Sequence, residues 1–531
     1  MSDDQALQEA REACGRREWA AAREGFLEAG HLRTDDLAAW ATSCWWLGEL
    51  DEYAAVSARL HQCLVQEGRG AEAALTAFEL GYTELVRGKE EAGVGWMARA
   101  RRLFEELPEA PERGFLLAAD AQVALGLGDL GTAERLAREA LALGQEHGLA
   151  TVAALGRFLC GCVDVHRGQT ERGLRAVDEA MLPVRAGEVS AEWVGLLYCD
   201  TMSLCFELLD LPRARRWTTM TERWCAGYAP AVLFTGICRV HRAQLRLVQG
   251  EWDRAETESR QAVQDLTTID VAVAAEAHYC LGELHRLKGD LTAADAAYRR
   301  AHELGRDPLP GTALLCLLRG RRHVADSILD AALAAQTRPL LRAPLLSARI
   351  EVCLAGDDPG AATTYLQELV RIAETHTSPG WQAEALRWRG AVLLARGRAG
   401  EAVPQLRAAQ EMWRRMDAPY QVSRTGLDLA LSYEALGDRT TARREREAAI
   451  AVLERLGARV GPGAARDLAG LTPRELEVLA AVADGSSNRE VARALQISER
   501  TVARHLANIY LKAQVTSRTA GVAWARDRGL L

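Results

Sequence analysis

Apolar residues recur along most of the chain in runs of helical length, and each run ends at a glycine. The stretch AEAHYCLGELHRLKG ends at Gly289 and is followed directly by DLTAADAAYRRAHELG, which ends at Gly305. Glycine ends a helix at low cost in the left-handed conformation, and a small residue in the next helix lets two helices approach closely. The pattern therefore predicts helical hairpins.

The hairpin signal, a glycine followed by four residues and an alanine, repeats along the chain. Gly88/Gly93 and Gly168/Gly173 are variants, a degenerate copy falls at Gly48, and the position near Leu209 keeps only Ala214. We expect twelve units, most of them 39 to 41 residues apart and shorter near Gly15, Gly289 and Gly320. Stacked hairpins bury what one hairpin cannot, so an all-α superhelical solenoid is predicted. The alanine-containing copies are Gly15/Ala20, Gly128/Ala133, Gly250/Ala255, Gly289/Ala294, Gly320/Ala325, Gly356/Ala361, Gly397/Ala402 and Gly437/Ala442.

Residues 1–457 resemble tetratricopeptide repeats in the small residues around each turn and in the aromatics of GEWDRAETESRQAV. The repeat is longer than the consensus of about 34 residues, which somewhat longer helices would explain. Two interpretations of this array stay open. It is either a scaffold without a small-molecule site or a concave surface for a peptide, protein or small-molecule effector.

The repeat stops at ARVGPGAARDLAG, residues 458–470, which we interpret as a linker because glycine and proline are dense there. The net charge changes sign at this point. Residues 471–531 contain nine Lys/Arg and six Asp/Glu, a charge of +3, and the rest of the chain contains 56 and 67, a charge of −11. The sequence therefore predicts a separate C-terminal domain at 471–531.

Capping signals divide this domain into helices. Thr472, Pro473 and Glu475 in TPRE form the start of a helix that we expect to end near Asp484, before Gly485. A second capping box, Ser487 with Glu490, begins a short helix through about Leu495. A turn at 496–497 then leads to Ser498 as the cap of a third helix, which runs to about Ala513. Two helices joined by a short turn can place the second one in a DNA major groove.

The third helix has two different faces. Val502, Leu506 and Ile509 form one apolar stripe, which must pack on the other helices. The remaining side can face DNA, where the short Ala503 and Ala507 allow close approach and Arg504 can reach a guanine. Helix N-termini with Ser, Thr and Asn side chains suit phosphate. The predicted DNA-binding residues are Ser487, Asn488, Ser498, Arg500, Thr501, Ala503, Arg504, Ala507, Asn508 and Lys512.

Residues 471–531 resemble the LuxR-type helix-turn-helix domain. The motifs that match are LTPRELEVL, GSSNREVARALQIS, TVARHLANIYLKA and the final GLL. The resemblance implies four helices, of which the third reads bases and the fourth, near 517–528, often forms a dimer contact. Ala503 replaces the family's usual lysine, and Ala513 with Gln514 replaces leucine-glycine, so base preference cannot be copied from relatives. His505 is a family position that either bridges helices or touches DNA.

Other chemistry finds little support in the sequence. The three lysines lie outside any P-loop pattern, and GxSxG and HExxH motifs are absent, so we expect no enzyme and no catalytic residues. The twelve cysteines include no CxxC pair, and Cys160 and Cys162 point to different helix faces, so neither a disulfide framework nor a metal site is expected. His278 and His285, and likewise Trp45 and Trp46, are interpreted as interior residues rather than metal or cofactor sites. No cofactor is predicted.

The acidic start MSDDQALQEA lacks a signal-peptide core, and the longest uncharged run is too short to span a membrane, so we expect a cytoplasmic protein. The scarcity of lysine against 62 arginines is interpreted as GC-rich codon usage and a bacterial origin. Together these patterns predict a homodimeric transcription regulator that binds double-stranded DNA and carries an effector or docking array. The alternative is a protein-interaction adaptor that its terminal domain only localises to DNA.

Overall fold

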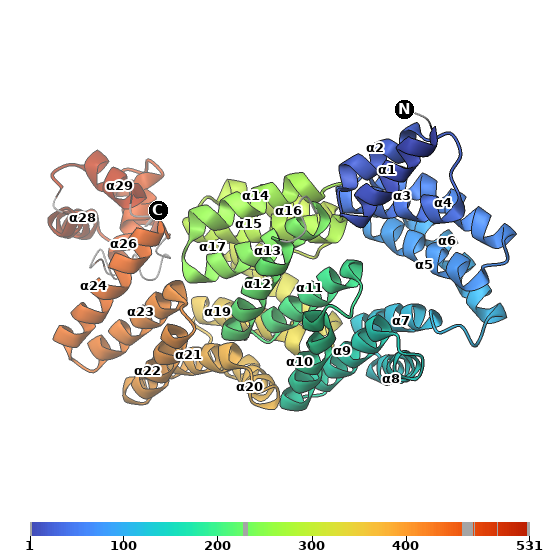
Figure 1. Ribbon diagram of the computed structural model, residues 1–531. Coiled ribbons are helices and arrows are strands. Elements are labelled where there is room, and N and C mark those ends of the chain that lie inside the picture. The colour runs from blue at the N-terminus through green and yellow to red at the C-terminus, as the bar shows by residue number, and fades with distance from the viewer. Residues whose placement is uncertain are drawn as a thin grey trace.

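A computed structural model describes residues 3–226, 232–458, 471, 473–495, 497–513 and 515–527. These residues form 28 helices and no strand, which confirms the all-α prediction. Figure 1 shows the helices of the array packed side by side in a coiled superhelix, with the last four helices gathered at its C-terminal end. No described helix is both long and apolar enough to cross a membrane.

The array consists of twelve consecutive helical hairpins, the number that the repeat pattern predicts. Their helices pack in sequential pairs. The pairs are α1 Asp3–Gly15 with α2 Trp19–Glu28, α3 Thr34–Leu47 with α4 Leu50–Gln66, α5 Gly70–Val86 with α6 Glu90–Glu106, α7 Arg113–Leu127 with α8 Leu130–Glu146, α9 Ala150–His166 with α10 Thr170–Ala186, α11 Ala191–Glu207 with α12 Leu211–Cys225, α13 Val232–Gln249 with α14 Trp252–Leu266, α15 Val271–Lys288 with α16 Leu291–Glu303, α17 Gly311–Leu318 with α18 Arg322–Ala335, α19 Pro339–Ala355 with α20 Pro359–Thr375, α21 Pro379–Ala395 with α22 Ala399–Arg415, and α23 Pro419–Ala435 with α24 Arg439–Leu456.

Each hairpin turn contains one residue in the left-handed conformation, and the residue five positions later is buried in the next helix. Gly128 (φ 82°) precedes Ala133, and Leu209 (φ 51°) precedes Ala214. The rule also corrects two predicted pairs. In the first hairpin Arg17 takes the left-handed conformation, so Ala22 is buried and Ala20 is exposed. In the tenth hairpin Asp357 does so, and Ala362 is buried more deeply than the predicted Ala361.

The variant with two glycines marks the closest helix contact in the fifth hairpin. A methyl group on Gly161 of α9 would lie 2.7 Å from the carbonyl oxygen of Gly173 on α10. Real Cβ atoms do not approach a backbone oxygen so closely, so both positions require glycine at this separation of the helices. A glycine five positions after the left-handed residue, here Gly173, therefore lets the two helix backbones lie nearer to each other than alanine would allow.

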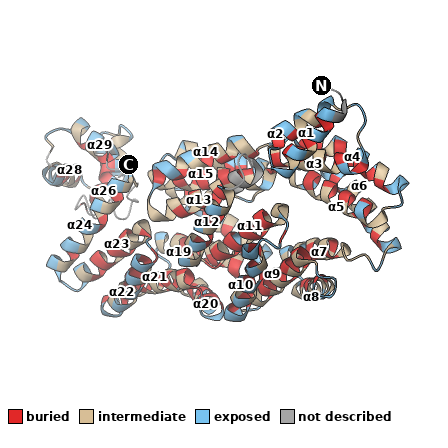
Figure 2. Ribbon diagram, in the orientation of Figure 1, coloured by how far each residue is buried: buried red, intermediate tan, exposed pale blue. Residues whose placement is uncertain are grey.

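Hairpins that are five apart in the sequence touch, so consecutive turns of the superhelix are in contact. Trp19 of the first hairpin packs in one cluster with Trp224 of the sixth, and Leu50 of the second packs with Leu266 of the seventh. Trp252 of the seventh lies 5.9 Å from Tyr420 of the twelfth, between ring centroids. In Figure 2 buried segments alternate with exposed ones along the helices of these stacked turns.

Polar contacts join the same turns. The imidazole of His376, at the end of the tenth hairpin, lies 3.0 Å from the carbonyl oxygen of Val165 in the fifth. Trp381 donates its indole N–H to the carbonyl of Glu207, from the eleventh hairpin to the sixth, at 2.9 Å. Arg338 donates to the carbonyls of Leu125 and Gly126 at 3.1 and 3.0 Å. The array is therefore a closed coil rather than an open solenoid.

Of the residues that the sequence placed in the interior, Trp46 is buried and Trp45, His278 and His285 are half-buried. Trp46 is 2% exposed and stacks on Trp19, with ring centroids 5.8 Å apart. Cys162 is buried and Cys160 is half-buried, as expected for two faces of α9. His278 and His285 are half-buried, and burial lowers the pKa of both imidazoles. No group of side chains suited to a metal occurs among the described residues.

The C-terminal segment forms α26 Pro473–Ala483, α27 Asn488–Ala494, α28 Glu499–Ala513 and α29 Arg518–Asp527. The array ends with α24, which Gly457 terminates in the left-handed conformation. Apart from Ala458, the predicted linker 458–470 lies outside the described residues, as do Thr472, Gln496, Gln514 and Arg528. The division into domains at 457 and 471 stays a prediction.

Candidate nucleic-acid interface

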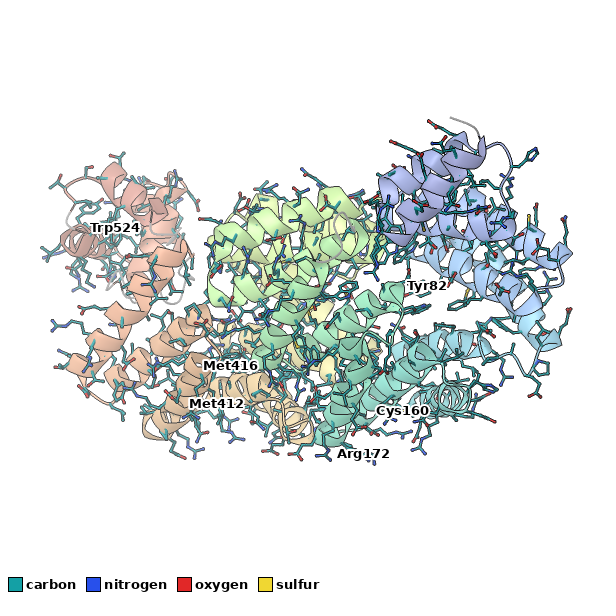
Figure 3. The ribbon with its side chains drawn as sticks, viewed as in Figure 1. Tyr82, Cys160, Arg172, Met412, Met416 and Trp524 are labelled. Atoms are coloured by element: carbon teal, nitrogen blue, oxygen red, sulfur yellow. The ribbon has the colours of Figure 1, made fainter. Side chains whose placement is uncertain are left out.

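The last four helices enclose a small core of their own. Leu479 of α26, Val491 of α27, Val502 of α28 and Ala525 of α29 are all fully buried in one cluster. Trp524 of α29, labelled in Figure 3, is half-buried and packs against this cluster. Every helix thus contributes an apolar residue, which fixes α28 against the other three. This core gives α28 a rigid support.

Side-chain caps set the starts of the two helices in the helix-turn-helix. Ser487 and Glu490 form the predicted capping box at α27, because Ser487 Oγ accepts the Glu490 N–H and the Glu490 carboxylate accepts the Ser487 N–H at 2.7 Å. Ser498 Oγ accepts the Thr501 N–H at 3.1 Å at the start of α28. Gly485 (φ 87°) ends α26, as predicted. The capping side chains therefore define where α27 and α28 begin.

The two faces of α28 are separated as the sequence predicts. Val502 and Ile509 are 0% exposed and Leu506 is 5% exposed, so the apolar stripe is fully used in packing. The opposite face is open to solvent. Its exposed residues are Arg500, Ala503, Arg504, Ala507, Asn508, Leu511 and Lys512. A helix whose outer face carries short side chains between arginines can approach base edges closely.

The two arginines of this face differ from the ion-paired arginines of the array. Arg69 and Arg349, for example, form several ion pairs each within the array. Among the residues that the structure describes, Arg500 and Arg504 have no ion-pair partner. Guanidinium groups without a carboxylate partner keep all their donors available for phosphate or guanine. The exposed face of α28 is therefore cationic and unneutralised at Arg500 and Arg504.

Lys512 has a partner that the sequence did not indicate. Its Nζ atom lies 2.7 Å from Oε2 of Glu475, and the Glu475 side chain is almost entirely buried between α26 and α28. The prediction that Glu475 closes a capping box with Thr472 falls partly outside the described residues. Lys512 thus connects the end of α28 to the start of α26, and its role as a DNA contact stays a prediction.

Asn488 also has a partner within the domain. Arg518, at the start of α29, donates to Asn488 Oδ1 at 2.9 Å and also to the Ser486 carbonyl. The Asn488 amide N–H₂ has no hydrogen-bond partner among the described residues, so it can still donate to a phosphate. Arg518 was missed in the sequence. A cation in the first turn of a helix opposes the helix dipole, and this unfavourable position is the signal that a specific partner exists.

The other predicted residues lie near the helix-turn-helix as expected. Ser487 and Ser498 are exposed, and Thr501 is half-buried, with its hydroxyl 2.7 Å from Ser498 Oγ. His505 is half-buried and has no hydrogen bond within the described part of the chain, so both interpretations of it stay open. Ala513, where the family pattern has leucine, is buried at the end of α28.

Comparison with known proteins identifies this region. Residues 469–525 match the family of bacterial regulatory proteins, luxR family, so the C-terminal region is a LuxR-type helix-turn-helix domain. The matched family is one of regulators and not of enzymes. The chain is 51% identical over 57 residues to the CsgBAC operon transcriptional regulatory protein of Escherichia coli, a match that covers 11% of this chain and 26% of that protein.

A second similarity is longer. The chain is 35% identical over 205 residues to a putative HTH-type transcriptional regulator of Mycobacterium bovis, which covers 36% of this chain and 22% of that one. Because 205 residues exceed the C-terminal domain, this similarity extends into the array. The matched segments span only about a quarter of the length of these curated relatives.

Among solved structures, a tetratricopeptide repeat protein from Parabacteroides merdae is 15% identical, with a TM-score of 0.30, over 60% of this chain and 99% of that one. The contacts between consecutive helices of the array establish its helical hairpins independently of this similarity.

Proposed function

We propose that the chain is a transcription regulator that reads DNA through α28 and receives a signal, as an effector or a protein partner, through the hairpin array. The observation that supports this most directly is the exposed face of α28, where Arg500 and Arg504 have no ion-pair partner among the described residues and the buried stripe holds the helix in place. The similarity of residues 469–525 to the luxR family supports the same conclusion.

Within this interface the residues have different roles. Arg504 lies in the middle of α28 between Ala503 and Ala507, so it is the side chain that we assign to a base edge. Arg500, Ser487, Asn488, Ser498 and Thr501 lie at the starts of helices, where side-chain donors and helix N-termini suit phosphate. Asn508 and Lys512 extend the same face toward the end of α28.

A homodimer would present two copies of α28 to half-sites related by two-fold symmetry. Residues 1–470, with a net charge of −11, oppose approach to DNA at long range. Affinity must therefore come from contacts of the C-terminal domain, and it should fall steeply as salt is added.

The test is a binding titration of the full-length protein, by mobility shift or anisotropy, against DNA fragments selected from genome-wide binding. Arg504→Ala should weaken binding by about 1 to 3 kcal/mol and relax the preference at one base position. The matched control is Arg59→Ala, an equally exposed arginine on α4 of the array, which should leave binding unchanged. Equal losses on every DNA sequence, including random DNA, would contradict a base-reading role for Arg504.

A further inference from the structure

A cavity of about 490 Å³ lies inside the N-terminal half of the coil. Its walls come from α3, α4, α5, α7 and α11, and Asp270 at the start of α15 also lines it. Tyr82, labelled in Figure 3, lies on α5 where the N-terminal helices face α11. A volume of this size is in the range of sites for small organic ligands.

One wall of the cavity is aromatic. Trp193 of α11 is surrounded by Phe115 at 4.9 Å and by Phe78 and Tyr82 at 6.2 Å each, between ring centroids. Trp45 and Tyr53 add two further rings to the lining. Faces of aromatic rings attract cations and also bury apolar groups well, so this wall suits an apolar body that carries positive charge.

Five carboxyl groups lie in the same lining. Asp35 and Glu72 pair with Arg69, and the other three are Glu79 on α5, Glu192 at the start of α11, and Asp270. Glu192 accepts a hydrogen bond from the Trp46 indole at 3.3 Å, and Asp270 accepts the N–H of Val273 at 2.9 Å. Within the described residues, Glu79 has neither a hydrogen bond nor an ion pair. Burial, with a smaller contribution from Glu192, raises the pKa of Glu79 to about 7.

The lining contains a single cation, Arg69, and its charge is already neutralised. Arg69 lies 3.0 Å from Asp35 and 2.5 Å from Glu72, at the end of the cavity where Asp35 is exposed. Carboxyl groups in a protein interior are normally paired with cations, because an unpaired buried charge is costly. Among the described residues, Glu79, Glu192 and Asp270 have no ion-pair partner, and a bound cation could supply one.

We propose that the cavity binds an organic cation, an amine or quaternary ammonium group attached to an apolar body, with the charge beside Glu79 and Glu192 and the body against the ring of Trp193. The proposal rests on the proposed function only in treating the array as the sensing part of the chain. Its test involves no DNA, so failure of this proposal and failure of DNA reading can be told apart.

The experiment compares three probes with one apolar body: phenylbutylamine, phenylbutanol and phenylbutyrate. Each is titrated into the full-length protein by calorimetry at about pH 8, where the amine is charged and Glu79 is ionised. The amine should bind about tenfold or more tightly than the alcohol, and the acid should bind more weakly than either. Equal affinities, a preference for the acid, or no binding of any probe would overturn the proposal.

Two substitutions assign the binding to this cavity. Glu79→Gln keeps the shape of the side chain and removes its charge, so the preference for the amine over the alcohol should fall about fivefold or more while alcohol binding stays the same. Trp193→Leu should weaken binding of both probes, since it removes the ring that contacts the shared body. The control, Glu24→Gln on the exposed face of α2, should change neither. A Glu79→Gln protein with the full amine preference would contradict the assignment.

Discussion

The ion pair of Glu475 with Lys512 shows how much one residue's environment changes its interpretation. From the sequence, Glu475 is a capping residue and Lys512 a DNA contact. In the structure the carboxylate is buried and the lysine amine lies 2.7 Å from it. Glu475 without Lys512 would be a buried charge with one partner fewer. Lys512 therefore acts on the position of α28 through α26, whatever it contributes to phosphate binding.

Lys512→Ala should destabilise the C-terminal domain by about 2 kcal/mol, because the buried carboxylate loses its cation. Hydrogen exchange of the α26 and α28 amides in the full-length protein measures this locally. Replacing both residues, as Glu475→Gln with Lys512→Met, should restore much of the lost protection, because no charge is then left buried. If Lys512→Ala weakened DNA binding without faster exchange in these helices, the lysine would be a DNA contact alone.

Glu79 makes the stability of the array depend on pH. Its pKa is raised to about 7 in the folded protein from an ordinary 4.5, so the folded state holds a proton that the unfolded state releases. Its contribution to stability is fully present below about pH 4.5 and is lost as the pH rises through 7. The groups that face it are Glu192 on α11 and Tyr53 on α4.

Comparison of Glu79→Gln with the unmodified protein isolates this contribution from the other titrating groups. When the pH is raised from about 5 to about 8, the free energy of unfolding of the variant should increase by about 1 to 3 kcal/mol relative to that of the unmodified protein. Thermal unfolding of both proteins at both pH values measures the stability difference between them and how that difference changes with pH. The exposed Glu24→Gln should show the same difference from the unmodified protein at both pH values. A pH-independent effect of Glu79→Gln would mean that Glu79 is solvated in the cavity.

At the scale of the helix, the hairpin turn is the unit that the sequence describes best. A left-handed residue and a small residue five positions later fix both the end of one helix and the contact of the next. The number of hairpins and most of their turns could therefore be predicted. The turns at Arg17 and Asp357 could not, because neither residue type prefers a positive φ and a nearby glycine suggests a different register.

Gly173→Ala tests the closest of these contacts. The added methyl group would meet the backbone of α9 at Gly161, which cannot move without shifting the helix. We expect a loss of about 1 to 3 kcal/mol in the free energy of unfolding, measured by denaturant titration. The matched control is Gly131→Ala in the exposed first turn of α8, where the same change should be neutral or stabilise by about 0.5 to 1 kcal/mol. Similar effects at both sites would contradict the contact.

The C-terminal helices were also predictable, because capping boxes and one apolar stripe determine them locally. The partners of Asn488 and Lys512 were not, because each pair joins positions at least 30 residues apart without any periodic pattern. The cavity could not be predicted from the sequence for the same reason. Its carboxyl groups and rings belong to α3, α4, α5, α7, α11 and the start of α15, and no single one of them marks a cavity in the sequence.

At the scale of the whole molecule, contact between hairpins five apart changes how the array responds to substitution. In an open solenoid each repeat contacts its neighbours only, and disturbances stay local. Here Arg338 binds the carbonyls that end α7, more than 200 residues away in the sequence. Stability should therefore be shared between distant turns of the coil.

Arg338→Ala should accelerate hydrogen exchange at the end of α7, around residues 120–130, because the last carbonyls of that helix lose their donors. The control is Arg371→Ala, an exposed arginine on α20 of the same turn of the coil, which should leave that exchange unchanged. Faster exchange confined to the helices next to Arg338 in the sequence would show that the coil is open in solution.

The adaptor alternative is also decided at this scale. If the array acted mainly by recruiting proteins, the Arg500/Arg504 double alanine variant would lose its promoter footprints while the cellular phenotype stayed intact. If the chain regulates transcription by reading DNA, both should be lost together. Genome-wide mapping of bound sites in the two strains provides the measurement.

The walls of the cavity extend from Thr34 to Asp270, so the ribosome must release just over half of the chain before the chamber exists. A small molecule cannot assist the early hairpins during synthesis. It can meet only a finished coil, and what it then stabilises is the contact of the second, third and fourth hairpins with the sixth rather than any single repeat.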